Sequence, residues 1–206
     1  MIQIRSTSKP FAAHPVLYQA MAALSRAEAM GVIPAQERIE SLDMPALRSV
    51  LRHLQDAGIG RTLQAAASGD LGQNPAALEH LLVQLNAAME ESPVPEFEWK
   101  KLTEVLGAEL LASLTGVSGS SLRRYSAQAR STPDPVAARV HLVAMIAGDL
   151  AGAYNEAGIR QWFSRNRVQL DGKCPADLLT GEWDTKAPGP ARVRELARTL
   201  MASPAT

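Results

Sequence analysis

The sequence contains a single cysteine and no long apolar run, and these two absences exclude several classes of protein. Cys174 has no second cysteine with which to form a disulfide within the chain of 206 residues, which agrees with a reducing compartment. No uncharged apolar run reaches the roughly 18 residues of a membrane-spanning helix. The first ten residues also lack the apolar core of a signal peptide. We therefore expect a cytoplasmic protein with one or two ordinary hydrophobic cores.

A net charge is missing as well, because 21 Lys and Arg balance 21 Asp and Glu. As a total this argues against nucleic-acid binding, since such domains usually carry a basic excess. The halves of the chain differ, however: residues 1–92 hold 7 basic and 9 acidic side chains, whereas residues 93–206 hold 14 and 12. The excess is sharpest between residues 116 and 142, where four arginines accompany one acid, so local charge is more informative than the total. These residues are Arg123, Arg124, Arg130 and Arg139, with Asp134.

Alternating strand patterns are also absent, whereas alanine and leucine are abundant and apolar residues recur three and four positions apart. This spacing predicts an all-α fold. In the first half, three such stripes, the second with Asp43 as its N-cap, predict a helical bundle over residues 1–92, whose role the sequence does not indicate. Pro93-Val-Pro95 marks the domain boundary, because proline disfavours helix in the residue before it.

Beyond this boundary the spacing predicts two regions. Residues 93–155 are expected to hold short helices and then a long one from Pro135 to Asn155, with Asp134 as its N-cap and its apolar side chains on one face. Residues 156–206 are expected to form a C-terminal module with a short helix, a loop, a helical turn and a last amphipathic helix.

The stretch from Leu110 to Tyr125 is typical of a helix-turn-helix. A short helix ends at Gly116, Val117 places one apolar side chain between helices, and Ser118 is a favourable N-cap for a helix that starts about four residues on. The start of that second helix would enter the major groove, where arginine pairs with guanine and hydroxyls suit phosphates. An ordinary helical hairpin with a solvated basic face is the alternative. The predicted DNA-binding residues are Ser118, Gly119, Ser120, Ser121, Arg123, Arg124, Gln128 and Arg130.

Motifs for catalysis and for metal binding are missing. The four histidines lie far apart, outside any HExxH or Cys/His spacing. Cys174 has no identifiable base partner, and the glycines from Gly116 to Gly119 lack the lysine of a phosphate loop. The acids Glu182 and Asp184 are most simply a solvated turn. We therefore expect no enzymatic activity, no cofactor and no metal ion.

A second informative pattern lies between residues 158 and 179. It consists of Trp162-Phe163, then Leu170-Asp-Gly172, then Pro175-Ala-Asp-Leu-Leu179, in that order. This pattern resembles the C-terminal half of the Xre/MbcA/ParS antitoxin family, in which a helix-turn-helix directly precedes the module. The resemblance covers about residues 97–202.

The resemblance implies a bacterial DNA-binding regulator that represses its own operon and binds a protein partner through its C-terminal module. In the family the partner is typically a toxin with the RES fold that degrades NAD. The aromatic residues have an alternative role as the core that seats the last helix, because aromatic side chains bury large areas. The candidate partner-binding residues are Arg160, Trp162, Arg165, Arg167 and Lys173.

Two further expectations concern the oligomeric state of the protein and the role of the predicted helix-turn-helix. A homodimer or larger oligomer is expected, because one helix-turn-helix covers little DNA and specificity normally needs paired half-sites. The alternative function is a protein-interaction module that neutralises a toxin and whose helix-turn-helix is only structural.

Overall fold

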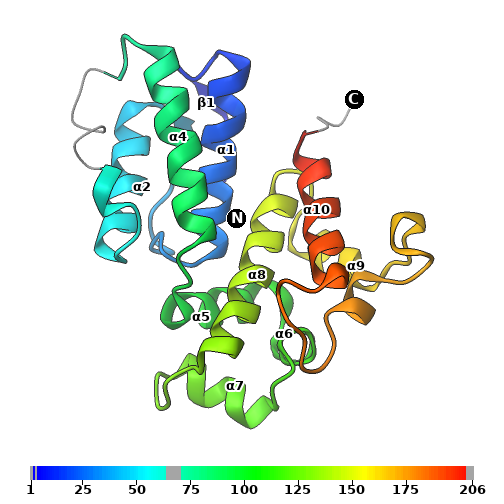
Figure 1. Ribbon diagram of the computed structural model, residues 1–206. Helices are drawn as coiled ribbons and strands as arrows, with labels where there is room; N and C mark the ends of the chain where they lie inside the picture. Colours follow the sequence, from blue (N-terminus) through cyan, green and yellow to red (C-terminus); the bar gives the residue numbers. More distant parts are fainter. Residues whose placement is uncertain (1, 3, 64–70, 203–206) are drawn as a thin grey trace. The chain divides into compact units, whose positions relative to one another are not determined.

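The computed structural model describes residues 2, 4–63 and 71–202, and helices dominate these residues (Figure 1). The exception is a short parallel pair in which β1 (Ser6–Thr7) lies beside β2 (Ser41–Leu42). The predicted all-α fold is confirmed. Two-residue strands are too short for an alternating pattern to appear in the sequence.

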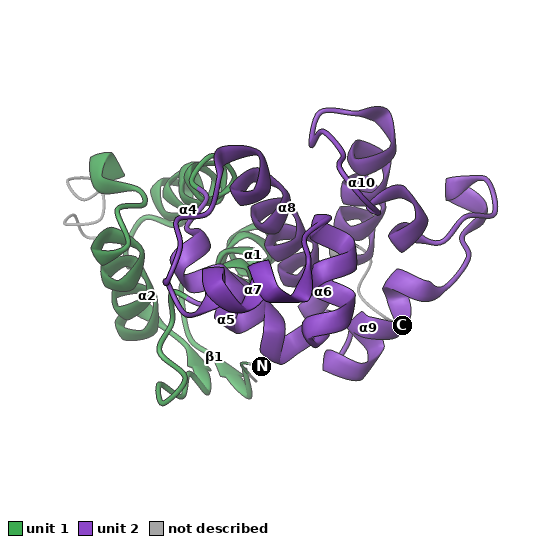
Figure 2. Cartoon of the chain, turned by 90° about the horizontal axis from the view of Figure 1, so that it is seen from below, with its two compact units in different colours: residues 1–28, 32–92 green, residues 29–31, 93–206 purple. Residues whose placement is uncertain are grey.

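The chain divides into two compact units, which Figure 2 colours separately. Unit 1 comprises residues 1–28 and 32–92, and unit 2 comprises residues 29–31 and 93–206. The two regions that the sequence suggests after residue 92 therefore lie within one unit.

Unit 1 is built from amphipathic helices whose leucines form its core. Asp43 caps the second of these helices, because its carboxylate accepts the N–H of Ala46 at 2.9 Å, as the sequence predicts. Asn74 caps the last one by accepting the N–H of Ala77 at 3.1 Å. The elements are α1 (His14–Ala29), α2 (Met44–Asp56), the 3-10 turn η1 (Arg61–Leu63) and α4 (Pro75–Glu90).

Unit 2 is organised around its longest helix, α8, against which helices from both ends of the unit pack. In Figure 1, α8 runs through the unit with α10 alongside it. The helices are α5 (Pro95–Leu106), α6 (Ala108–Thr115), α7 (Gly119–Ser126), α8 (Asp134–Ala151), α9 (Glu156–Ser164) and α10 (Pro188–Ala202). The 3-10 turns η2 (Val168–Leu170) and η3 (Pro175–Leu178) lie between α9 and α10.

The ends of α8 differ from those that the sequence predicts. Pro133, not Asp134, occupies the N-cap position, so Asp134 is the first helical residue. The helix ends at Ala151 instead of Asn155. The side chain of Asn155 is used as the cap of α9, where it accepts the N–H of Gly158 at 2.8 Å. Asn155 therefore marks the start of α9 and is not the last residue of α8.

The burial of α8 also differs from the prediction of one apolar face. Its buried residues include Arg139, His141 and Asp149, because other helices cover it on several sides. Asp149 forms an ion pair with Arg194 of α10. His141 Nδ1 lies 2.6 Å from a carboxylate oxygen of Glu98 on α5. These buried pairs link the central helix to α5 and to α10, and each supplies the partner that a buried charge requires.

No single helix of the described residues is long and apolar enough to cross a membrane. Helices α8 and α9 meet the length and the apolar composition of a span only together, and the chain bends by 118° between them. The apolar surface of α8 is instead covered by the other helices of unit 2.

Candidate nucleic-acid interface

The turn between α6 and α7 has the backbone geometry that the sequence predicts. Gly116 ends α6 with φ of 67°, in the left-handed region that favours glycine. Ser118 is the N-cap of α7, and its Oγ accepts the N–H of Ser121 at 3.1 Å, which confirms the predicted cap. The hydroxyls of Ser120 and Ser121 lie 2.9 and 3.0 Å from the same Oγ. The first turn of α7 therefore places three hydroxyls at the positive end of the helix dipole.

The predicted DNA-binding residues lie on the surface around α7. Arg123 and Arg124 are exposed, and within the described residues their side chains form no hydrogen bond or ion pair. Their guanidinium groups are therefore available to a ligand. Ser121 is half-buried, and the remaining predicted residues are exposed, namely Ser118, Gly119, Ser120, Gln128 and Arg130.

Two of these residues are also used within unit 2. Gln128 has a positive φ of 54°, and its side-chain N–H donates to the carbonyl of Glu96 at 3.4 Å. The guanidinium carbon of Arg130 lies 5.8 Å from the centre of the Tyr125 ring. Both side chains brace the loop that follows α7, so they are weaker candidates for base contact than Arg123 and Arg124.

A buried aromatic pair packs α7 against α5. The Tyr125 ring stacks on the Trp99 ring of α5, with centroids 5.5 Å apart and planes 21° apart. Trp99 is fully buried, and its Nε1–H donates to the hydroxyl of Thr132 at 3.0 Å. This pair is not among the features predicted from the sequence. The spacing of Trp99 from Leu102 and Leu106 on one helical face was the available signal.

The loop before α10 holds the end of α6, although the sequence suggests a solvated turn there. The Trp183 Nε1–H donates to the carbonyl of Leu114 at 2.9 Å. The carbonyl of Gly181 accepts a hydrogen bond from Arg139 Nη1 at 3.2 Å and lies so close to Gly116 that a Cβ there would collide with it. The turn between α6 and α7 is therefore fixed by residues more than sixty positions further along the chain.

The five predicted partner-binding residues do not form one surface. Trp162 is 1% exposed, so its side chain belongs to the core and is not available to a partner. Arg160 donates from Nε to the carbonyl of Val105 at 2.7 Å and thereby ties α9 to α5. The guanidinium of Arg167 lies over the Trp162 ring, 5.5 Å from its centre. These three side chains are mainly structural.

The other two residues lie on the surface. Arg165, the residue after α9, donates from Nη2 to the side-chain carbonyl of Gln161 at 2.9 Å, and Lys173 is exposed. Between them the loop is closed by a backbone hydrogen bond from Arg167 N–H to the Lys173 carbonyl, at 2.9 Å. This loop presents Val168, whose side chain is 91% exposed. Val168 is not among the residues predicted from the sequence, although a valine within a polar loop indicates an exposed apolar side chain.

Comparisons with known proteins do not identify the chain. No protein-family model matches it, and no curated protein or solved structure is significantly similar to it. Function is therefore argued from the geometry. In the part of the chain that the structure describes, no group of three or more His, Cys, Asp or Glu side chains is placed to hold a metal ion. Burial raises the pKa of the Cys174 thiol, which disfavours the nucleophilic thiolate.

Proposed function

We propose that this chain is a non-enzymatic, cytoplasmic DNA-binding regulator of the antitoxin type, which binds operator DNA through α6 and α7. The observation that carries the proposal is the surface of α7. Arg123 and Arg124 are exposed and unengaged there, directly after a first turn that Ser118 caps. Hydroxyls and N-terminal amides suit phosphate oxygens, and arginine suits the edge of guanine.

Arg123 and Arg124 have different roles in this proposal. Adjacent residues on a helix point about 100° apart, so the two guanidinium groups do not reach the same DNA feature. One contacts a base edge and the other a phosphate of the flanking backbone. Two copies of the chain, acting as a homodimer, place one α7 at each of the two half-sites of the operator, as specificity requires.

The proposal is tested by fluorescence anisotropy with the DNA upstream of the chain's own gene. We expect the double variant Arg123→Ala/Arg124→Ala to bind about tenfold or more weakly than wild type, because each good arginine contact contributes roughly 1–3 kcal/mol. The slope of log K against log salt should also decrease by up to about two, since each lost phosphate contact removes about 0.9.

A charge-matched control is available in unit 1. Arg48 and Arg52 are exposed on α2, so Arg48→Ala/Arg52→Ala removes the same charge from unit 1 and leaves the sequence of α7 unchanged. This control should retain wild-type affinity. Equal binding by the Arg123/Arg124 variant and wild type would contradict the proposed DNA contact.

The exposed loop between Arg167 and Lys173 favours a second candidate function, that of a protein-interaction module with a structural helix-turn-helix. An exposed apolar tip, Val168, beside the cations Arg165 and Lys173 suits a partner with an apolar spot and acidic neighbours. The family resemblance makes a RES-type toxin the partner to test. Stable co-purification with the neighbouring gene's product, lost in Val168→Asp and without retention on DNA, would favour this function over the first.

A further inference from the structure

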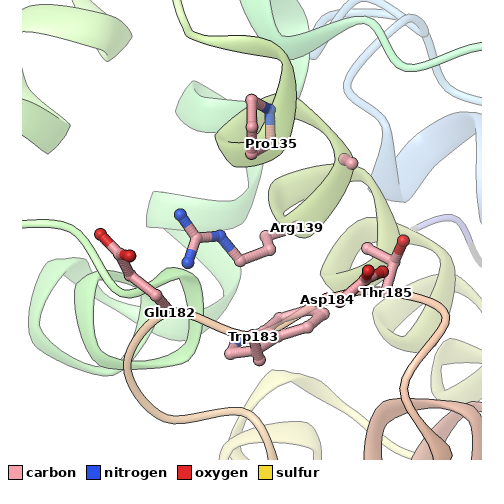
Figure 3. A pocket seen from close by; sticks show the side chains of 7 residues that line it. Pro135, Arg139, Glu182, Trp183, Asp184 and Thr185 are labelled. Carbon is pink, nitrogen blue, oxygen red and sulfur yellow. The ribbon is translucent and has the colours of Figure 1, made fainter.

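A pocket of about 360 Å³ lies in unit 2 between the start of α8 and the loop before α10 (Figure 3). Helix α8 contributes Pro135, Ala138 and Arg139, and the loop contributes Glu182, Trp183 and Asp184. A volume of this size suits a small molecule. The residues that line the pocket are not among those proposed to contact DNA, so DNA binding does not account for the pocket.

The charge of Arg139 is the unusual feature of this pocket. The side chain is only 5% exposed, yet among the described residues no carboxylate lies within ion-pair distance of it. Its Nη1 donates to the neutral carbonyl of Gly181, and its Nε is buried without an acceptor. A buried cation is costly unless an anion accompanies it. Arg139 therefore provides a positive charge at the wall of the pocket that no carboxylate of the described residues neutralises.

The wall of the pocket that Trp183 forms is fixed in place. Figure 3 shows the Trp183 ring beside the Arg139 side chain. The indole is held because its Nε1–H donates to two carbonyls, those of Leu114 and Leu179, at 2.9 and 2.8 Å. The ring cannot turn without breaking both hydrogen bonds, so its face is a stable surface. A flat apolar group fits against such a surface.

The rim of the pocket selects the charge of the anion. Glu182 and Asp184 are exposed and lie on either side of Trp183. Their carboxylates repel a multiply charged group such as a phosphate more strongly than a singly charged one. A carboxylate also matches the planar geometry of the guanidinium group.

We propose that this pocket binds a small aromatic carboxylate, whose carboxylate pairs with Arg139 and whose ring packs on Trp183. The pocket adjoins the turn between α6 and α7, because the loop before α10 lines the pocket and also contacts Gly116 and Leu114. Binding is nevertheless a property of unit 2 alone and does not depend on the proposed DNA contact.

The experiment uses the full chain, without DNA, and benzoate as the probe. The chain has three tryptophans, so a proton–nitrogen correlation spectrum contains three indole N–H signals, and loss of one in Trp183→Phe assigns that of Trp183. We expect benzoate to shift this signal saturably. Benzamide, which has the same shape without the charge, should bind at least about tenfold more weakly, because hydrogen bonds to charged groups are the stronger ones.

Three variants locate the site. Arg139→Met should weaken benzoate binding about tenfold or more by removing the charge. Ala138→Phe should block the pocket while leaving Arg139 and its hydrogen bond to Gly181 in place, and it keeps the test decisive if Arg139→Met does not fold. Glu182→Gln should bind benzoate a few-fold more tightly, because it removes a repulsive charge from the rim.

Equal binding of benzoate and benzamide would overturn the proposal, because it would show that the charge of Arg139 is not recognised. Undiminished benzoate binding by Ala138→Phe would overturn it as well, since the ligand would then lie elsewhere. An absence of any benzoate-dependent shift at Trp183 would have the same consequence.

Discussion

Gly116 carries two separate constraints that make it the most sensitive single position near α7. Its positive φ disfavours any side chain, and the carbonyl of Gly181 occupies the space that a Cβ would need. We expect Gly116→Ala to lower the free energy of unfolding by about 3 kcal/mol or more, because positive φ alone costs roughly 1–2 kcal/mol and the collision adds to it.

The control for this prediction is Gly172→Ala. Gly172 also has a positive φ, of 79°, but a Cβ built there meets nothing within 4 Å. Thermal unfolding of both variants separates the backbone cost from the collision. Equal losses of stability would show that the contact between Gly181 and Gly116 is unimportant.

Glu98 is a residue whose charge is affected by burial. It is fully buried beside His141, and burial raises the pKa of its carboxyl group. The folded state therefore holds this proton more tightly than the unfolded state. The contribution of Glu98 to stability is then fully present below the ordinary pKa of 4.5 and decreases as the pH rises above it.

This pH dependence is measured by urea unfolding of wild type and Glu98→Gln at pH values from 4 to 7, about the range in which native proteins are usually stable. The stability of wild type relative to the variant should decrease as the pH rises. A constant difference between wild type and Glu98→Gln would contradict the assignment.

At the scale of elements, the ion pair of Asp149 and Arg194 is the strongest polar link between α8 and α10. Both side chains are buried, so removing one partner leaves the other charge in the core. We expect Arg194→Met to destabilise the protein by roughly 3–5 kcal/mol. The double variant Asp149→Leu/Arg194→Met should regain much of this loss in chemical unfolding. A double variant as unstable as the single one would show that packing, not charge, is responsible.

The elements themselves follow closely from local sequence. Asp43 and Ser118 cap helices where the pattern places them, because a cap depends on residues within one turn. Contacts between distant segments do not follow in this way. The role of Trp183 depends on a carbonyl of α6 almost seventy positions earlier, and no local pattern contains that information.

The local features of the candidate site were likewise predicted from the sequence, whereas its contacts with distant segments were not. Arg123 and Arg124 lie on the surface as expected, since the spacing of Leu122 and Tyr125 already turns them outward. Trp162 was misplaced among the partner contacts, because sequence spacing alone does not separate a buried aromatic from an exposed one. Arg139 lies at the edge of the apolar face of α8, and this position was the available sign that it is buried.

At the scale of the whole molecule, burial lowers the number of exposed cations in the basic stretch of residues 116–142. Arg139 faces a pocket, so the exposed cations of residues 116–142 are Arg123, Arg124 and Arg130. We expect the slope of log K against log salt to be no steeper than about −3 per protomer, because each phosphate contact contributes about −0.9. A salt titration of operator binding measures it, with the slope divided by the number of protomers bound. A slope of about −6 or steeper per protomer would require further cations outside α7.

The contact between Gly181 and Gly116 also determines where the helix-turn-helix can be cut out of the chain. A fragment that stops at Asn155 contains every residue proposed to touch DNA, yet it lacks the acceptor of Arg139 and the indole that holds Leu114. Such a fragment would leave the turn unsupported and Arg139 open to water. The segment proposed to bind DNA is therefore not expected to keep its structure on its own, and a transplant into another protein requires the segment up to α10 as well.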